Sequence, residues 1–260
     1  MRPAPRLATA VRSAYEDPAH VRAFAAVADE GLTPFEVALV RRFTPGQRIL
    51  DVGCGGGREA VPMAQAGLRP VAMDVSVAMV RAATAHASER GVPLPVVAAS
   101  LSALPFRPEA FDGVALLGQV IAHVPGRDGR IAALREVRRA LRPGGTLVMT
   151  THNRRCHWKF ALFFGWVNRW RRLLRRFGRG SGLGDHDRWS ARIGRLEGGP
   201  PVFFHMYDLD EATADLAEAG FEVVRARSRG EFEAGREDAA ARRRDYLLGF
   251  VATRPVDAQP

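Results

Sequence analysis

The sequence predicts an α/β fold: a mostly parallel, seven-stranded sheet with helices on both faces. Short apolar runs alternate with helical patterns over the first 150 residues, as they do in βα units. Glycine and proline-glycine turns separate the two kinds of segment. The expected strands are 48–52, 70–74, 95–98, 111–117, 146–151, 221–227 and 246–253.

Helices are expected between the strands. In the helix expected at 128–141, Ile131, Leu134 and Leu141 recur at helical spacing, and the turn signal Pro143-Gly144-Gly145 follows it. The charged segment 229–245 is expected to be a loop or a solvated helix. The other expected helices are 58–66, 76–90 and 209–219.

Composition excludes several classes of protein. The chain has 260 residues, 47% of them hydrophobic, so it can form one large domain or two small ones. The apolar run 160–167 is far shorter than the roughly 20 residues that cross a bilayer. The N-terminus lacks the apolar stretch of a secretory signal, so a cytoplasmic location is expected. Cys54 and Cys156 are too few for a disulfide framework or a cysteine zinc site, and no metal is expected.

The positive charge is concentrated in one segment. Lys and Arg number 38 against 28 Asp and Glu, for a net charge of +10, and residues 151–200 hold +9 of it. Such a surplus suggests a nucleic-acid or membrane partner. Because Lys159 is the only lysine and alanine is abundant, a GC-rich coding bias is an alternative explanation.

A glycine-rich turn at 53–57 follows the first strand and precedes a helix. Glycines there allow positive φ and close approach of a ligand, and the helix presents free N–H groups. The second strand ends in Asp74, whose carboxylate can accept both hydroxyls of a ribose. Together they predict a nucleoside-containing cofactor. A dinucleotide is an alternative, because Gly55 to Ala60 satisfies G-x-G-x-x-A, although Arg58 breaks the G-x-G-x-x-G pattern that starts at Gly53.

Asp51 and the downstream segments separate these two interpretations. DVGCGGG, MDVS, ALPF, FDGVALL and LRPGG together resemble the class I S-adenosylmethionine-dependent methyltransferases, in the broad group with small-molecule and quinone methyltransferases. The resemblance covers 48–151 and, weakly, 204–224. It implies a Rossmann-like fold with the last strand antiparallel, a helical insertion after the fifth strand, and S-adenosyl-L-methionine as cofactor.

The resemblance also implies roles for individual residues. Asp51 would lie near the methionine ammonium of the cofactor and Asp74 would hold its ribose. Ser100 and Leu101 replace an acidic residue that usually accepts from the adenine amino group, so a weaker hydrogen bond is expected there. The remaining implied cofactor contacts are Gly53, Gly55 and Gly57 at the methionine part, Val75 or Met79 on the adenine, and Gln119 in the cofactor and acceptor pocket.

The acceptor side is less defined. A sulfonium methyl group is already activated, so the protein mainly aligns the reactants and sometimes removes a proton. His123, His152 and His205 are candidates for a general base or acceptor contact, and each has a purely structural alternative. Tyr15, in an N-terminal helix, is a candidate lid over the cofactor.

The basic segment contains an amphipathic helix. It could be a lid that packs its apolar face over the acceptor pocket, a helix lying in a membrane interface through residues 158–179, or an RNA contact. Tryptophans at 158, 166, 170 and 189 suit both lipid and bases. Residues 178–189 are expected to be a flexible loop. In helical projection, apolar residues 163, 164, 167, 170, 174 and 177 oppose arginines 169, 172, 175, 176 and 179, with Arg171 at the border.

These observations predict a methyltransferase that acts on a small organic acceptor by in-line displacement. The alternatives are a membrane-associated lipid or quinone methyltransferase, a tRNA or RNA methyltransferase that uses the basic insertion, a non-catalytic adaptor with the same fold, and an NAD-dependent enzyme. The expected segments are a helical cap (1–45), the cofactor-binding core (46–152), the basic insertion or lid (153–206) and the C-terminal part of the core (207–260).

Overall fold

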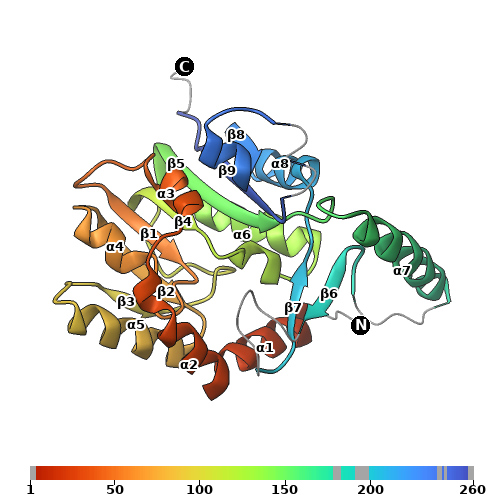
Figure 1. Cartoon of the computed structure of the whole chain (residues 1–260), viewed down its shortest axis with the longest axis horizontal. Helices are drawn as coiled ribbons and strands as arrows, with labels where there is room; N and C mark the ends of the chain where they lie inside the picture. Colours follow the sequence, from red (N-terminus) through yellow and green to blue (C-terminus); the bar gives the residue numbers. More distant parts are fainter. Residues whose placement is uncertain (1–3, 178–182, 191–198, 239–241, 243–244, 257–260) are drawn as a thin grey trace.

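A seven-stranded sheet forms the centre of the molecule (Figure 1), in the order β3-β2-β1-β4-β5-β9-β8. The computed structural model describes residues 4–177, 183–190, 199–238, 242 and 245–256. β1 to β5 are parallel, and β9 runs antiparallel to both of its neighbours, which confirms the predicted sheet. The strands are β1 (Arg48–Val52), β2 (Arg69–Asp74), β3 (Val96–Ala98), β4 (Phe111–Leu116), β5 (Leu141–His152), β8 (Glu222–Ser228) and β9 (Leu247–Thr253).

Helices cover both faces of this sheet, because its strands are apolar on both sides. Leu50 and Val52 of β1 belong to a core cluster with α6 and α8, whereas Ile49 packs with α3, α4 and α9 on the other face. The helices are α1 (Ala4–Tyr15), α2 (Pro18–Ala26), α3 (Pro34–Val40), α4 (Ala60–Gln65), α5 (Val77–Glu89), α6 (Arg127–Ala140), α7 (Trp158–Arg176), α8 (Leu209–Glu218) and α9 (Arg229–Ala234).

Short polar residues start several of these helices. The Ser76 hydroxyl accepts from the Met79 amide at the start of α5, and Asp208 accepts from the Glu211 amide at the start of α8. In the N-terminal region, α3 begins with a capping box of Thr33 and Glu36. α3 also contributes to the sheet core, so part of the region expected as a cap covers the sheet.

Three expectations require correction. Asp187–Ser190 is strand β6, paired antiparallel with β7 (Val202–His205), so this part of the expected loop is ordered by backbone pairing. α9 is not solvated, because Glu231 and Phe232 are buried. The apolar face predicted for α7 is divided: Phe164 contacts the body, whereas other members of the set point outward. Arg179 lies outside the described residues, as does the side chain of Arg175.

The carboxyl ends of β1, β2, β4 and β5 lie along one edge of the sheet, since these strands are parallel. Open α/β sheets bind their ligands at this edge. Near this edge, α1 contacts β7 of the insertion, and α2 contacts α5 (Figure 1).

Candidate active site

The glycine-rich turn adopts the backbone that its sequence predicts. Gly53, Gly55 and Gly57 have φ values of 75°, 50° and 87°, in the region that favours glycine. A Cβ atom built on Gly53 would lie 2.3 Å from Cγ2 of Val120. The amides of Gly53 and Cys54 donate to the Met73 carbonyl at 2.8 and 3.0 Å, which ties the turn to the end of β2.

Asp51 carries a buried oxygen without a partner. The residue is 2% exposed, and its Oδ2 atom forms no hydrogen bond within the described part of the chain. Burial, followed by the nearby negative charge of Glu59, raises the pKa of Asp51 well above its usual value. An unpaired buried carboxylate is costly, so this atom suits a cationic ligand such as an ammonium group.

Asp74 is held in place by backbone amides. The Gly55 amide donates to Oδ2 at 3.0 Å and the Ser76 amide donates to Oδ1 at 2.9 Å. Burial raises the pKa of Asp74, although these hydrogen bonds act in the opposite direction. The carboxylate therefore has a fixed orientation beside the glycine turn, and each oxygen retains acceptor capacity for a ligand hydroxyl.

The expected adenine contacts lie in different environments. Val75 is half-buried beside Asp74, whereas Met79 is fully buried in the first turn of α5. Leu101 belongs to the main core, and the exposed Ser100 accepts from the Ser102 amide at 3.2 Å. In this arrangement Val75 and Ser100 are the more accessible of the four.

Gln119 follows β4 in a left-handed conformation, with a φ of 60°. Its backbone amide and side-chain amide both donate to the Thr150 hydroxyl at 3.3 Å, which links the ends of β4 and β5. A left-handed residue other than glycine is uncommon and costs free energy, and such residues are frequent at ligand sites. The structure thus brings Gln119 to the same edge as Asp51.

Tyr15 and His123 connect the N-terminal helices to this edge. The Tyr15 hydroxyl lies 3.1 Å from His123 Nε2, and His123 Nδ1 lies 2.7 Å from the Phe203 carbonyl. Because a carbonyl only accepts, Nδ1 carries the proton and Nε2 accepts from Tyr15. Burial lowers the pKa of His123 and raises that of Tyr15, so both groups are neutral. The Ser76 hydroxyl also donates to the Tyr15 carbonyl.

A family comparison agrees with this geometry. Residues 49–145, which run from β1 into β5, match the family model described as a methyltransferase domain. Residues 49–145 therefore form a methyltransferase domain. Its glycine turn, Asp51, Asp74 and Gln119 all lie within the matched residues.

Known relatives are similar to this chain over only part of their own length. The ubiquinone biosynthesis O-methyltransferase of Xanthomonas campestris pv. campestris is 37% identical over 111 residues, which are 42% of this chain and 45% of the relative. The chain thus matches less than half the length of that enzyme.

Solved structures share the fold over a greater length. A SAM-dependent methyltransferase from Methanosarcina mazei superposes with a TM-score of 0.62 at 19% identity, over 87% of this chain and 100% of that one. The CcbJ methyltransferase from Streptomyces caelestis also gives 0.62 at 19% identity, over 93% and 98%. At this identity the likeness shows the fold alone.

His152 lies at the carboxyl end of β5 in the methyltransferase domain, inside a group of aromatic rings. Its ring centroid is 5.1 Å from that of Phe204 and 4.7 Å from that of Tyr246. The buried Nδ1 atom has no hydrogen-bond partner among the described residues. Burial, together with the positive charge of Arg188, lowers the pKa of His152 to about 3, so the imidazole is neutral.

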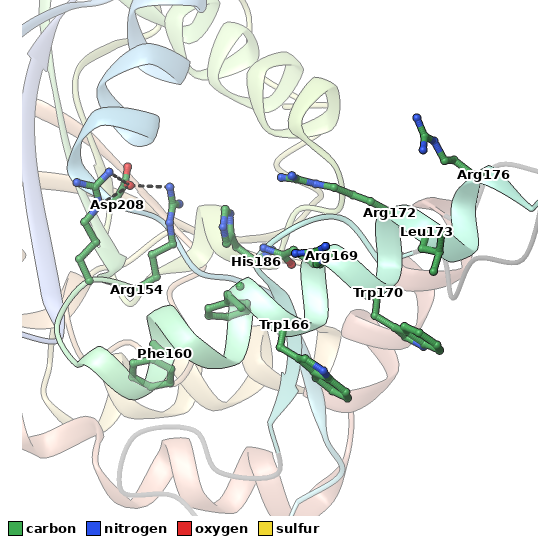
Figure 2. A pocket seen from close by; sticks show the side chains of 14 residues that line it. Arg154, Phe160, Trp166, Arg169, Trp170, Arg172, Leu173, Arg176, His186 and Asp208 are labelled. Atoms are coloured by element: carbon green, nitrogen blue, oxygen red, sulfur yellow. Dashed lines mark hydrogen bonds and ion pairs between the residues drawn. The ribbon is translucent and has the colours of Figure 1, made fainter.

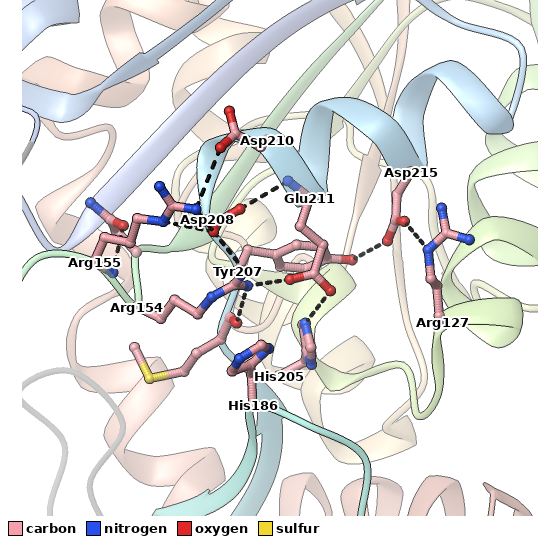
Figure 3. Close-up of polar contacts among 12 residues, drawn as sticks. Arg127, Arg154, Arg155, His186, His205, Tyr207, Asp208, Asp210, Glu211 and Asp215 are labelled. Atoms are coloured by element: carbon pink, nitrogen blue, oxygen red, sulfur yellow. Dashed lines mark hydrogen bonds and ion pairs between the residues drawn. The ribbon is translucent and has the colours of Figure 1, made fainter. Parts of the chain in front are cut away.

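His205 is part of an ion network instead (Figure 3). Its Nδ1 lies 2.8 Å from Asp187 and its Nε2 lies 2.9 Å from Glu211. Glu211 also pairs with Arg154 and Arg130. Both ring nitrogens of His205 are therefore occupied, and the residue joins the β6–β7 pair to α8. Among the described residues, no group of three or more His, Cys, Asp or Glu side chains could hold a metal ion.

Several residues near the site were not expected from the sequence. A Cβ on Gly55 would lie 3.4 Å from the Phe24 ring, so α2 covers the turn. Glu16 accepts from the Val77 amide at 2.7 Å and thereby fixes the end of α1 on α5. Thr150 supports Gln119. None of these belongs to a local motif, because each acts across more than 30 residues of sequence.

Proposed function

We propose that the protein transfers a methyl group from S-adenosylmethionine to a hydroxyl group of a small organic acceptor. The observation that carries the proposal is the unpartnered oxygen of Asp51, buried beside the glycine turn and Asp74. The bound cofactor would supply a methyl group on a positively charged sulfur. The O-methyltransferase relative supports oxygen as the methylated atom.

The charge around Asp51 suits a cationic cofactor. Asp51, Asp74 and Glu59 are buried carboxylates, and the positive charge of Arg58 acts on Asp51. Arg58 is itself engaged by Glu36 and Glu59. A cofactor with an ammonium and a sulfonium group would relieve this excess of negative charge. Asp51 would bind the ammonium group, and Asp74 would accept from the ribose hydroxyls.

On the acceptor side, we assign the proton-accepting role to His152. Its Nδ1 atom has no partner, whereas Nε2 of His123 is occupied by Tyr15. The rings of Phe204 and Tyr246 exclude water from His152 and suit a flat, apolar acceptor. Tyr15 and His123 would close the N-terminal helices over the bound ligands.

Titration calorimetry with S-adenosylhomocysteine tests the cofactor site. We expect Asp51→Asn to weaken binding by at least about tenfold, because a charge-assisted hydrogen bond contributes roughly 1.5–3 kcal/mol. Asp128→Asn, at an exposed position on α6, is the matched control and should bind as the unmodified protein does. Absence of heat at high concentrations of the unmodified protein would refute the proposal.

Mass spectrometry of a metabolite extract incubated with methyl-labelled cofactor would identify the acceptor. A labelled ether is the expected product. With that acceptor, His152→Asn should lower kcat by about 100-fold or more, the usual range for a general base, while S-adenosylhomocysteine binding stays unchanged. Label on nitrogen or carbon would reject the hydroxyl acceptor.

We also propose that the protein associates peripherally with a membrane. The outward face of α7 supports this location, since Trp166 on the helix and Phe177 directly after it are each 72% exposed. Every helix in the described residues is too short or too polar to cross a bilayer. Cosedimentation with lipid vesicles tests the association, and a protein that remains in the supernatant with every vesicle composition would exclude it.

A further inference from the structure

α7 has three distinct sides. One side packs on the body through Phe164 and Asn168, which are buried, and Arg171, whose guanidinium donates to the carbonyls of Gly184 and Asp187. A second side is apolar and exposed. Its large side chains recur every three or four residues and form one stripe, which we call the apolar stripe: Trp158, Leu162, Phe163, Trp166, Trp170, Leu173 and Phe177.

The third side of α7 borders a groove of 1360 Å³ between the helix and the body (Figure 2). Arg169, Arg172 and Arg176 line it from the helix, and Arg154 and Arg155 line it from the segment after β5. Figure 2 shows Trp166 and Trp170 on the opposite side of α7 from Arg172 and Arg176. Trp166, Trp170 and Leu173 of the apolar stripe also line the groove, so the stripe and the groove share an edge.

The groove has a surplus of positive charge. Arg154 pairs with Asp208 and Glu211, and Arg155 pairs with Asp208 and Asp210. Arg172 pairs with Asp185 at 2.5 Å. Arg169 and Arg176 have no ion-pair partner in the part of the chain that the structure describes. α7 contains no acidic residue in any of its 19 positions. The groove can therefore accept anions without first breaking existing pairs.

We propose that this groove binds the phosphates of anionic phospholipids while the apolar stripe lies in the bilayer interface. The proposal rests on the peripheral membrane association proposed above. Tryptophan rings prefer the interface, and arginines beside an inserted stripe reach the headgroup phosphates. Arginine also binds phosphate through two parallel hydrogen bonds.

The composition of the stripe favours lipid over RNA. Leu162 and Leu173 cannot stack on bases, yet both lie in the stripe between the aromatic rings. A surface with one apolar side and one cationic rim matches a bilayer with anionic headgroups.

Vesicle binding by the full-length protein tests the proposal, with phosphatidylcholine vesicles compared to vesicles that also contain phosphatidylglycerol. The first variant is Arg169→Gln with Arg176→Gln. It should lower affinity for the anionic vesicles by about 30-fold, because each basic side chain at such a surface contributes about fivefold. The control, Arg81→Gln with Arg107→Gln, removes two exposed arginines outside α7 and should have little effect.

A second variant separates the two proposals. Trp166→Ser with Trp170→Ser should abolish binding to both vesicle types, whereas the arginine variant should retain binding to phosphatidylcholine. Equal affinity of the arginine variant and the unmodified protein for anionic vesicles would overturn the groove proposal alone. Failure of the unmodified protein to bind any vesicle would overturn the membrane association.

Two further measurements define the ligand. Transfer RNA that displaces the vesicles, and binds the tryptophan variant as tightly as the unmodified protein, would overturn the lipid proposal in favour of RNA. Displacement by inorganic phosphate at millimolar concentration would identify free phosphate as the ligand instead. S-adenosylhomocysteine binding should be the same for every variant and reports independently on the methyltransferase site.

Discussion

At the scale of single residues, the site is built from buried groups that are unfavourable in the free protein. Asp51 has a carboxylate oxygen without a partner, and His152 has a ring nitrogen without one. Burying such atoms costs stability unless a ligand satisfies them. A ligand that satisfies these atoms recovers this free energy. A substitution that stabilises the free protein at these atoms should therefore weaken ligand binding.

Asp51→Asn should therefore stabilise the free protein at pH 7 while it weakens cofactor binding. The raised pKa of Asp51 means that its favourable contribution is present below the unfolded pKa of about 3.9 and is lost as pH rises through the folded pKa. Removing the charge should raise the melting temperature by roughly 2–4 °C at pH 7. The gain should disappear on acidification, and an unchanged melting temperature at both pH values would contradict the assignment.

His152 should make the protein sensitive to mild acid. Because its pKa in the folded protein is lowered to about 3, the neutral imidazole contributes stability above the unfolded-state pKa near 6.5. This stability is lost as pH falls towards 3. Between pH 7 and 5 the loss should be on the order of 2 kcal/mol. Denaturant unfolding of His152→Asn should show a shallower pH dependence over that range, and parallel curves would rule out a neutral buried imidazole.

At the scale of elements, the glycine turn depends on contacts with the segment after β4. A Cβ on Gly53 would meet Val120 as well as require a positive φ. Gly53→Ala should therefore cost about 2–5 kcal/mol, from the sum of backbone strain and overpacking. Gly46→Ala is the matched control, because Gly46 has a φ of 87° and no neighbour within 4 Å, so it should cost only about 1–2 kcal/mol. Urea denaturation compares the two, and equal losses would exclude the Val120 contact.

The charged network attaches the β6–β7 pair to α8. Burial acts to raise the pKa of Glu211, but hydrogen bonds and charges from His205 and Arg154 outweigh it and hold the pKa at about 2. Its contribution is therefore present above pH 4.3 and is lost as pH falls through about 2. Glu211→Gln should cost on the order of 2 kcal/mol and increase proteolysis within the insertion at pH 7. Unchanged cleavage rates would argue against this attachment.

At the scale of the whole molecule, charge is divided unevenly between two regions of the chain. Residues 151–200 hold +9 of the net charge of +10, and the cofactor edge is rich in buried carboxylates. Raising sodium chloride from roughly 0.05 to 0.5 M shortens the Debye length several-fold and should weaken binding to anionic vesicles. Calorimetry should show little change in S-adenosylhomocysteine affinity, because the site is buried. Equal salt sensitivity of both would contradict this division.

Much of the fold followed from local patterns. All seven strands of the main sheet lie within a few residues of their predicted positions, apart from an earlier start of β5, because apolar runs and glycine turns are local signals. Strands β6 and β7 were not predicted, since each is only four residues long and their pairing joins residues on either side of the segment 191–201. The prediction of a loop or solvated helix was wrong for α9. Its sequence is charged, but Glu231 is buried and pairs with Arg242, and this contact cannot be inferred from local sequence.

The sequence by itself determined the sheet, the glycine turn and the acidic residues at the ends of β1 and β2, because their spacing along the chain dictates their place at the sheet edge. Only the tertiary structure decided which polar atoms remain without partners and which face of α7 meets the body. Both depend on contacts between distant segments. The Tyr15 hydroxyl is hydrogen-bonded to His123, and carboxylates pair with His205. On α7, Phe164 rather than Trp166 packs inward. Helical periodicity defines an amphipathic face, but burial depends on what lies beside it.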